Sequence, residues 1–455
     1  MNRRSFIRNV AAVGAAAVFS HRTLASLVSP TKRRPRILLR GAWQTTNIGD
    51  IGHTPGALGL IERYFPQAEV MLWPGGVGHG AREFLQRSYP ALEIVEDYPA
   101  VTSLKPTNDE LRAAWQRADF MLHGSGSGFG ARAHLAAWHR ETGKPYGVFG
   151  VSADPISGFG DGRDPEGGTL ADLRARISKL PVTHLDAETR SVIENASFMF
   201  LRDGISLDYL RAQGVRTRGV MEFGPDTQFA MEQRDDAKGD AFRHAHGLQA
   251  GNYLCVIPRL RYTPYWQLYN RPMNATDPTR DAINQRTTER DNAKLRELII
   301  AYVRQTGNRV MTCPEMTYQI ELAKAVLVDP LPDDVKAKVV WRDTYWLPDE
   351  AAAIYARAQA VVSMDCHSPI IAIANGTPAF YVRQPTDTCK GQMYHDLGLS
   401  DWIFEVEETS GDELWSRLQA TFTNPDRARA YGEAAMARVR ARQRHMAETL
   451  KAAIT

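Results

Sequence analysis

One histidine stands where an apolar run ends and a short capped helix is expected to begin. Ser368 follows His367 as a good N-cap residue, Pro369 suits the first helical position, and Gly376 suits the left-handed residue just past the helix. Unpaired N–H groups at such a helix N-terminus favour a bound anion and disfavour an imidazolium. His367 and the nearby Asp365 are therefore candidates for acid–base chemistry, with an incidental surface histidine in a structural turn as the alternative.

A second group of candidates lies in the first loop between a strand and a helix, where Rossmann-like folds contact ligands. The sequence there is Asn47, Ile48, Gly49 and Asp50. Gly49 permits close approach of a ligand to the backbone, and Asp50 can act as a base or orient a hydroxyl. A tight turn in which Asp50 bonds its own backbone is the alternative. The next helix is expected to start at Thr54-Pro55.

A glycine-rich run follows the strand at 120–123. It reads His-Gly-Ser-Gly-Ser-Gly-Phe-Gly from His123 to Gly130, and its first glycine, Gly124, is a candidate phosphate or carboxylate contact. A loose dinucleotide fingerprint fits the run, but it follows an internal strand and no P-loop lysine comes after it. We therefore expect no dinucleotide cofactor; separately, no other cofactor and no metal are expected.

Four cations follow apolar strands, which places them at the carboxyl ends of a parallel sheet. Such a set would suit a substrate with two or more negative groups, although a single cation of this kind is commonly a surface charge. Aromatic residues near the same strand ends would stack on sugar rings or pack between domains. The cations are Arg202, Arg259, Arg261 and Lys390, and the aromatic residues are Trp43, Tyr262, Tyr265 and Trp266.

Apolar runs alternate with amphipathic stretches along the chain, which is typical of α/β folds with parallel sheets. We expect strands at 37–43, 70–73, 120–123, 146–149, 198–201 and 220–223, and a second series at 253–257, 310–311, 339–341, 360–362 and 379–382. These two series predict two Rossmann-like domains in a GT-B-like arrangement with an interdomain cleft. The expected domains are 36–235 and 250–410, with closing helices at 411–455. A polar linker is expected at 232–252, and a long loop or helical insertion at 267–294.

The N-terminus is typical of an exported protein. Arg3 and Arg4 precede an apolar run that is too short to span a bilayer, and small residues follow it, so residues 1–25 are predicted to be a twin-arginine signal peptide. Removing them takes away four arginines and no acids, which changes the formal charge from +3 to −1. We therefore expect a periplasmic or secreted protein without nucleic-acid partners or a membrane span, exported by the twin-arginine translocase.

Four cysteines lie in the second half, and their spacings match no zinc-site pattern. Both disulfides and free thiols are consistent with the sequence. The four are Cys255, Cys313, Cys366 and Cys389.

The ordered series of motifs resembles the polysaccharide pyruvyl transferase family over residues 36 to 405. The matching blocks are Asn-Ile-Gly-Asp at 47–50, the glycine-rich run near 124, Leu-Arg-Asp at 201–203, Gly-Pro-Asp at 224–226, and the block at 363–378 with its His-Ser and Ala-Asn-Gly-Thr-Pro, followed by Lys390. The resemblance implies a GT-B-like fold and transfer of pyruvate from phosphoenolpyruvate to two hydroxyls of a cell-surface or exopolysaccharide glycan, which forms a cyclic ketal.

The resemblance also implies roles for individual residues. His367 would be the general acid, Asp50 the base or acceptor contact, and Lys390 and Arg202 the anion contacts; Arg259 and Arg261 are additions from their placement. Asp365 stands where the family usually carries an arginine. This departure, together with export, leaves two alternatives open: a hydrolase that removes pyruvate ketals with Asp365 and His367, and a glycan-binding protein without catalysis.

Overall fold

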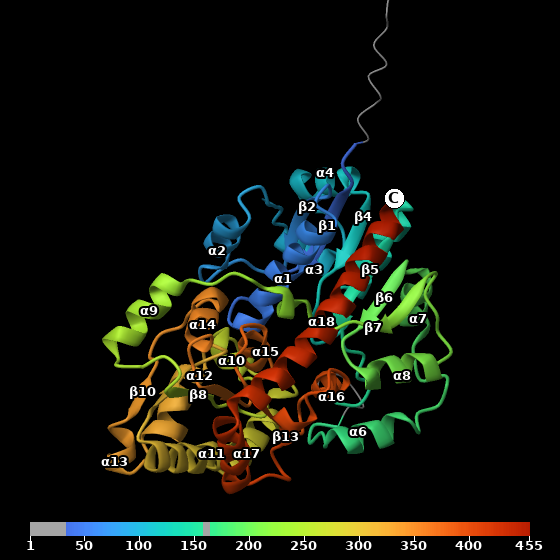
Figure 1. Ribbon diagram of the computed structural model, residues 1–455. Coiled ribbons are helices and arrows are strands. Elements are labelled where there is room, and N and C mark those ends of the chain that lie inside the picture. The colour runs from blue at the N-terminus through green and yellow to red at the C-terminus, as the bar shows by residue number, and fades with distance from the viewer. Residues whose placement is uncertain (1–32, 158–163) are drawn as a thin grey trace, which may run out of the picture. The chain divides into compact units, whose positions relative to one another are not determined.

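The computed structural model describes residues 33–157 and 164–455. The signal peptide expected at residues 1–25 lies outside the described residues, so it stays a prediction. Pro35–Thr455 forms one unit that contains two separate parallel sheets with helices on both sides (Figure 1).

The first sheet has seven strands in the order β3-β2-β1-β4-β5-β6-β7, and every neighbouring pair is parallel. Apolar residues fill most of these strands, which are buried because helices cover both faces of the sheet. The strands are β1 (Arg36–Gly41), β2 (Glu69–Pro74), β3 (Glu93–Ile94), β4 (Phe120–His123), β5 (Tyr146–Val151), β6 (Phe198–Leu201) and β7 (Val220–Phe223).

The second sheet has six parallel strands in the order β10-β9-β8-β11-β12-β13. In both sheets the strand order reverses beside the first strand of the series, and this is the place where open α/β sheets bind ligands. The strands are β8 (Tyr253–Ile257), β9 (Arg309–Thr312), β10 (Val339–Trp341), β11 (Ala360–Ser363), β12 (Ala379–Arg383) and β13 (Ile403–Glu405).

Helices connect the strands of each sheet. Those of the first half are α1 (Ile48–Tyr64), α2 (Ala81–Ser88), α3 (Tyr98–Ser103), α4 (Asp109–Arg117), α5 (Arg132–Thr142), α6 (Leu170–Ile177), α7 (Ala187–Asn195), α8 (Gly204–Ala212) and the short η1 (Thr227–Ala230). Those of the second half are α9 (Asp236–Ala245), α10 (Tyr265–Leu268), α11 (Asp277–Thr306), α12 (Gln319–Ala323), η2 (Lys324–Val328), α13 (Asp333–Lys336), α14 (Pro348–Tyr355), α15 (His367–Ala374), η3 (Cys389–Gly391), α16 (Gln392–Asp396), η4 (Ser400–Trp402), α17 (Gly411–Thr423) and α18 (Pro425–Ile454).

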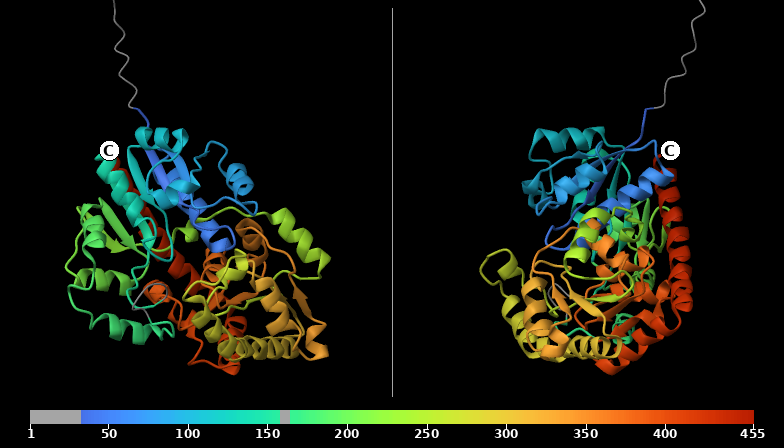
Figure 2. Two further views of the ribbon diagram at one scale, coloured as in Figure 1. Left: turned by 180° about the vertical axis from the view of Figure 1, so that it is seen from behind. Right: turned by 60° about the vertical axis from the view of Figure 1, so that its left-hand side comes forward.

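The last helix ties the two halves together. Helix α18 starts beside the second sheet and returns along α1 and β6 of the first half, as both views of Figure 2 show. Met446 and Leu450 near its end are buried with Ile37 and Phe200 in the same apolar cluster. The C-terminal residues therefore complete the core of the N-terminal sheet.

The expected strands are confirmed, with ends that shift by one or two residues, and the two short edge strands β3 and β13 were missed. The expected linker at 232–252 contains α9, and most of 267–294 lies in the 30-residue helix α11. The expected helix start at Thr54 is wrong. Helix α1 begins after Asn47, whose side chain accepts a hydrogen bond from Gly49 N, and Pro55 lies inside the helix.

The four cysteines are buried free thiols, which decides between the two alternatives left by their spacing. Within residues 33–157 and 164–455, each helix is either too short or too polar to cross a lipid bilayer.

Candidate active site

The carboxyl ends of strands from both sheets converge on one buried polar cluster. The loop after β1 leads into α1, and the loop after β9 carries Glu315 from the other half. The two loops are joined directly, because Ile48 N donates to Glu315 O at 3.0 Å and Thr317 N donates to Thr46 O at 3.0 Å. Residues from the two halves of the chain are therefore in contact at these two loops, as expected for a GT-B-like arrangement.

His367 is the first residue of α15 and is held by the Glu315 carboxylate from the loop after β9. Its Nδ1 lies 2.9 Å from Oε1 of Glu315, and Oε2 of Glu315 accepts a hydrogen bond of 2.6 Å from Ser368 N. Glu315 thus satisfies both the imidazole and an orphan N–H of the helix N-terminus. The other ring nitrogen, Nε2, is buried without a hydrogen-bond partner among the described residues, so its hydrogen-bonding capacity is unused.

The surroundings of His367 favour its protonated form, which differs from the neutral ring expected at a helix N-terminus. Burial lowers the pKa of His367, but the Cys366 sulfur and the Glu315 carboxylate raise it by more, so the pKa lies well above its usual value. Burial also raises the pKa of Glu315, yet its contacts with His367 and Ser368 outweigh burial and leave that pKa below its usual value. The two shifts agree on a charged pair.

A second histidine, which the sequence analysis missed, lies beside the first. The rings of His53 and His367 meet edge to face with their centroids 5.1 Å apart. His53 Nε2 lies 3.1 Å from Oδ2 of Asp226, and Arg202 Nη1 donates to the same oxygen at 2.8 Å. Burial raises the pKa of Asp226, but His53, Arg202 and His367 hold it far below its usual range. Arg202 is fully buried, so it orders this carboxylate rather than facing an open cleft.

The predicted anion contacts Arg259 and Lys390 come together, but each faces a carboxylate. Arg259 pairs with Asp387 and lies 3.5 Å from Asp365, and Lys390 lies 3.4 Å from Asp387. Gln319 Nε2 also donates to Asp365 at 2.8 Å. Burial raises the pKa of Asp365 to about 6 against the opposing charge of Arg259. At neutral pH two cations therefore balance two carboxylates.

Asp50 lies at the edge of an open hollow of about 600 Å³, which we call the Asp50 hollow. Its Oδ2 accepts a hydrogen bond of 2.5 Å from Gln44, and its Oδ1 lies 3.9 Å from His53 Nδ1. Among the residues that line the hollow, the rings of Tyr265 and Tyr269 are stacked at 5.7 Å. Trp43, Gln44, Arg271, Arg280 and the glycine-rich loop line it as well. Aromatic rings beside such polar groups suit a sugar.

The remaining predicted residues have structural contacts. Arg261 pairs with Asp291 at 2.6 Å and with Glu407 at 2.8 Å, outside the His367 cluster. Gly124 N donates to Arg40 O in β1. The expected N-cap role of Ser368 is wrong, because α15 begins at His367, two residues before Pro369, and Ser368 Oγ accepts a hydrogen bond from Tyr355. The expected left-handed Gly376 is confirmed, with φ of 82°.

Two sets of side chains in the cluster offer three metal-ligand atoms within 4.8 Å of one another. In the first set the carboxylate already accepts a hydrogen bond from Arg202, and in the second one carboxylate already accepts from Ser368 N and another from Gln319. Protein donors thus compete with a metal ion for these oxygens. The sets are His53, Asp226 and His367, and Glu315, Asp365 and His367.

Two parallel Rossmann-like sheets, with the carboxyl ends of their strands meeting at one polar cluster, define a protein of the GT-B-like class. The family model for polysaccharide pyruvyl transferases matches residues 77–384, and the chain therefore belongs to that family. A search of curated proteins gives no significant match.

Three solved structures with the same fold, each bound to UDP or a UDP-sugar, have low sequence identity to this chain. Staphylococcus aureus MnaA with UDP is 10% identical, with a TM-score of 0.55 and coverage of 88% of this chain and 91% of that one. Anabaena HepE with UDP-glucose is 12% identical, with a TM-score of 0.51 and coverage of 92% and 99%. The Neisseria meningitidis UDP-GlcNAc 2-epimerase bound to UDP-GlcNAc is 11% identical, with a TM-score of 0.50 and coverage of 91% and 99%. At these identities the likeness concerns the fold alone.

Proposed function

We propose that this chain is a pyruvyl transferase that forms pyruvate ketals on a cell-surface or exopolysaccharide glycan. The observation that carries the proposal is the placement of the His367 ring, fixed at Nδ1 by Glu315 and unpartnered at Nε2, in surroundings that raise its pKa. A general acid needs a proton to give and a second contact that fixes its orientation, and His367 has both. Family membership supplies the reaction class.

In the proposed reaction, Nε2 of His367 protonates the methylene carbon of phosphoenolpyruvate, which becomes a methyl group. One sugar hydroxyl adds to the cation-like carbon that results and gives up its proton, with Asp50 as the candidate base in the adjoining hollow. A second hydroxyl then displaces phosphate, which carries away the second proton. The products are the cyclic ketal and inorganic phosphate, and return of the proton from Asp50 to His367 restores both side chains, so atoms and charges balance.

Ketal hydrolysis is a second candidate, and one observation favours it. Asp365 and Asp387 balance the charges of Arg259 and Lys390, which leaves this cluster without the positive excess that a phosphate and a carboxylate together require. A pyruvate ketal carries only one carboxylate. His367 would protonate a ketal oxygen and Asp365 would direct water to the ketal carbon, which yields pyruvate and the free diol.

The compartment bears on the same choice. We propose export to the periplasm or beyond, on the basis of the paired arginines and the short apolar run within residues 1–25. Phosphoenolpyruvate is a cytoplasmic metabolite, whereas water and glycans are present outside the cell. Export therefore supports the hydrolase, and family membership supports the transferase.

One assay separates these functions. The purified protein is incubated with pyruvylated and unmodified exopolysaccharide, with and without phosphoenolpyruvate, while free pyruvate and phosphate are measured. Phosphate release that requires the unmodified glycan supports the transferase. Pyruvate release without phosphoenolpyruvate supports the hydrolase and overturns the transferase. Glycan binding without either product leaves a binding protein that has lost catalysis.

A further inference from the structure

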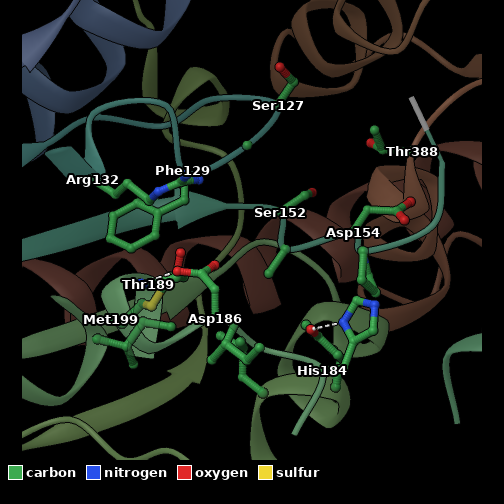
Figure 3. A pocket seen from close by; sticks show the side chains of 17 residues that line it. Ser127, Phe129, Arg132, Ser152, Asp154, His184, Asp186, Thr189, Met199 and Thr388 are labelled. Atoms are coloured by element: carbon green, nitrogen blue, oxygen red, sulfur yellow. Dashed lines mark hydrogen bonds between the residues drawn. The ribbon is translucent and has the colours of Figure 1, made fainter. Parts of the chain in front are cut away.

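A second hollow is lined in part by residues of the glycine-rich loop (Figure 3). It encloses about 400 Å³, and we call it the Phe129 hollow. Figure 3 shows Phe129 and Arg132 on one side of it and His184 and Asp154 on another. The site assigned above uses none of these side chains.

The two hollows share a wall. Ser127 and Gly128 line both the Asp50 hollow and the Phe129 hollow. A Cβ placed on Gly128 would meet no atom within 4 Å, so the space above this glycine is open. The loop at Gly128 therefore leaves room for a ligand beside the wall that the two hollows share.

The lining of the Phe129 hollow suits a neutral polar ring better than an anion. One arginine, Arg132, faces two carboxylates, Asp154 and Asp186, so the hollow has no positive excess. The ring of Phe129 is partly buried and packs against the ring of His123, with 5.6 Å between the two ring centroids. This contact restricts the position of the Phe129 ring. A fixed aromatic face beside hydrogen-bonding groups of both kinds matches a sugar, which presents C–H groups on its face and hydroxyls at its edge.

The Phe129 hollow also reaches the segment that carries Lys390. Thr388 lines the hollow, and its Oγ1 accepts a hydrogen bond from Lys390 N. Cys389 N donates to Asp154 at 2.8 Å, which ties the same segment to the first half of the chain. A ligand in this hollow would therefore touch both halves beside the candidate site.

We propose that the Phe129 hollow binds the sugar next to the reacting one. The substrate is then a glycan segment of at least two sugars that crosses Gly128, with its reacting unit in the Asp50 hollow. This inference rests on the proposed action on a glycan and adds that a monosaccharide is a poor substrate because it fills one hollow only.

The test compares binding of a panel of bacterial exopolysaccharides, each supplied as fragments of two to six sugars and as its component monosaccharides. Dissociation constants are measured by titration calorimetry on the purified protein. For at least one panel member, the fragments are expected to bind at least tenfold more tightly than the monosaccharides. Equal affinity for both, or no binding of any member, overturns the inference.

Variants locate the length dependence. Phe129→Ala should weaken fragment binding about fivefold to tenfold and leave monosaccharide binding unchanged, because it removes one aromatic contact. Phe129→Tyr keeps the ring and should restore binding. Gly128→Leu should remove the length dependence by blocking the crossing between the hollows.

Arg132→Ala should weaken fragment binding, whereas the matched control Arg140→Ala, an exposed arginine of the same helix, should not. Length dependence that survives Gly128→Leu and Phe129→Ala places the second sugar elsewhere and overturns the assignment.

Turnover measured in parallel keeps the two proposals apart. Phosphate or pyruvate release that does not depend on fragment length retains the proposed function and overturns the second subsite. Length-dependent binding without any product retains the subsite and overturns the catalytic proposal.

Discussion

Gly49 and His367 are in direct contact: a Cβ on Gly49 would lie well under 3.0 Å from three atoms of the His367 side chain, including Cγ and Nδ1 of the ring. The glycine belongs to α1 of the first half and the histidine to α15 of the second. The candidate acid can occupy this position only because residue 49, in the other half of the chain, is a glycine and has no side chain.

Gly49→Ala tests this dependence. The added methyl group must push the imidazole away, and we expect turnover to fall about 100-fold, as a shift of about 1 Å can cause. The free energy of unfolding should fall by about 1–3 kcal/mol, as overpacking usually costs. Turnover and urea denaturation measure the two effects. Gly76→Ala is the matched control, since its Cβ would meet only one methyl carbon at 3.8 Å, and it should leave both unchanged. Full activity in Gly49→Ala would contradict the assignment of His367.

Glu315→Gln tests the origin of the raised pKa of His367. The amide oxygen still accepts from Ser368 N, but the negative charge beside the imidazole is gone. Activity that needs protonated His367 is present at low pH and is lost as the pH rises through its pKa. Because the variant lowers that pKa, the loss should occur at lower pH than in the wild type. A pH–rate profile measures the shift, and Glu321→Gln, an exposed position on α12, is the control. An unchanged alkaline limb would show that another group titrates.

Much of the fold could be predicted because each strand is a local apolar run. The expected spans at 198–201, 220–223, 253–257 and 339–341 match the observed strands residue for residue. The start of α1 was misplaced because its first turns contain several glycines, which are typical of a loop. In the structure these glycines let α1 pack closely against η1, since a Cβ on Gly56 would overlap the backbone of Thr227. The need for glycine at these positions comes from tertiary packing, so the local sequence does not indicate a helix there.

The site could be predicted only in part for the same reason. His367 was found because its position after a strand is a local feature. Glu315 was missed because its partner lies more than fifty residues away in the chain and the loop around it has no motif. His53 could have been predicted from the sequence. It stands four residues after Gly49, and residues at this spacing share one face of a helix, so both meet His367. The pairing of Arg259 and Lys390 with carboxylates depends on long-range contacts that spacing cannot give.

Asp365→Asn separates the two catalytic proposals. The amide can keep a contact with Gln319 while the charge beside Arg259 is removed. For a transferase, the released positive charge should lower KM for phosphoenolpyruvate about tenfold. For a hydrolase that uses Asp365 as a base, pyruvate release should fall by about 10²-fold or more.

The pH dependence gives an independent check on Asp365. Its pKa of about 6 means that the base form appears as the pH rises through that value. Hydrolysis by the wild type should therefore increase across this range, and the Asn variant should lack the increase. The matched control is Asp333→Asn at an exposed position of α13, which should change neither KM nor the profile. A variant that retains both activities unchanged would remove Asp365 from either mechanism.

Asp226→Asn tests the buried pair with Arg202, in which both side chains are fully buried. The variant removes the carboxylate that pairs directly with the buried guanidinium, and we expect a loss of about 3–5 kcal/mol in the free energy of unfolding at pH 7. Because the pKa of Asp226 is lowered by folding, its contribution is complete above the unfolded pKa of about 3.9 and is lost as the pH falls. The difference in the free energy of unfolding between wild type and variant, measured by urea denaturation, should therefore become smaller below that pH. Asp208→Asn, which breaks the exposed pair with Arg174, should cost at most about 1 kcal/mol. Equal losses in the two variants would mean that burial does not determine the strength of the Asp226 pair.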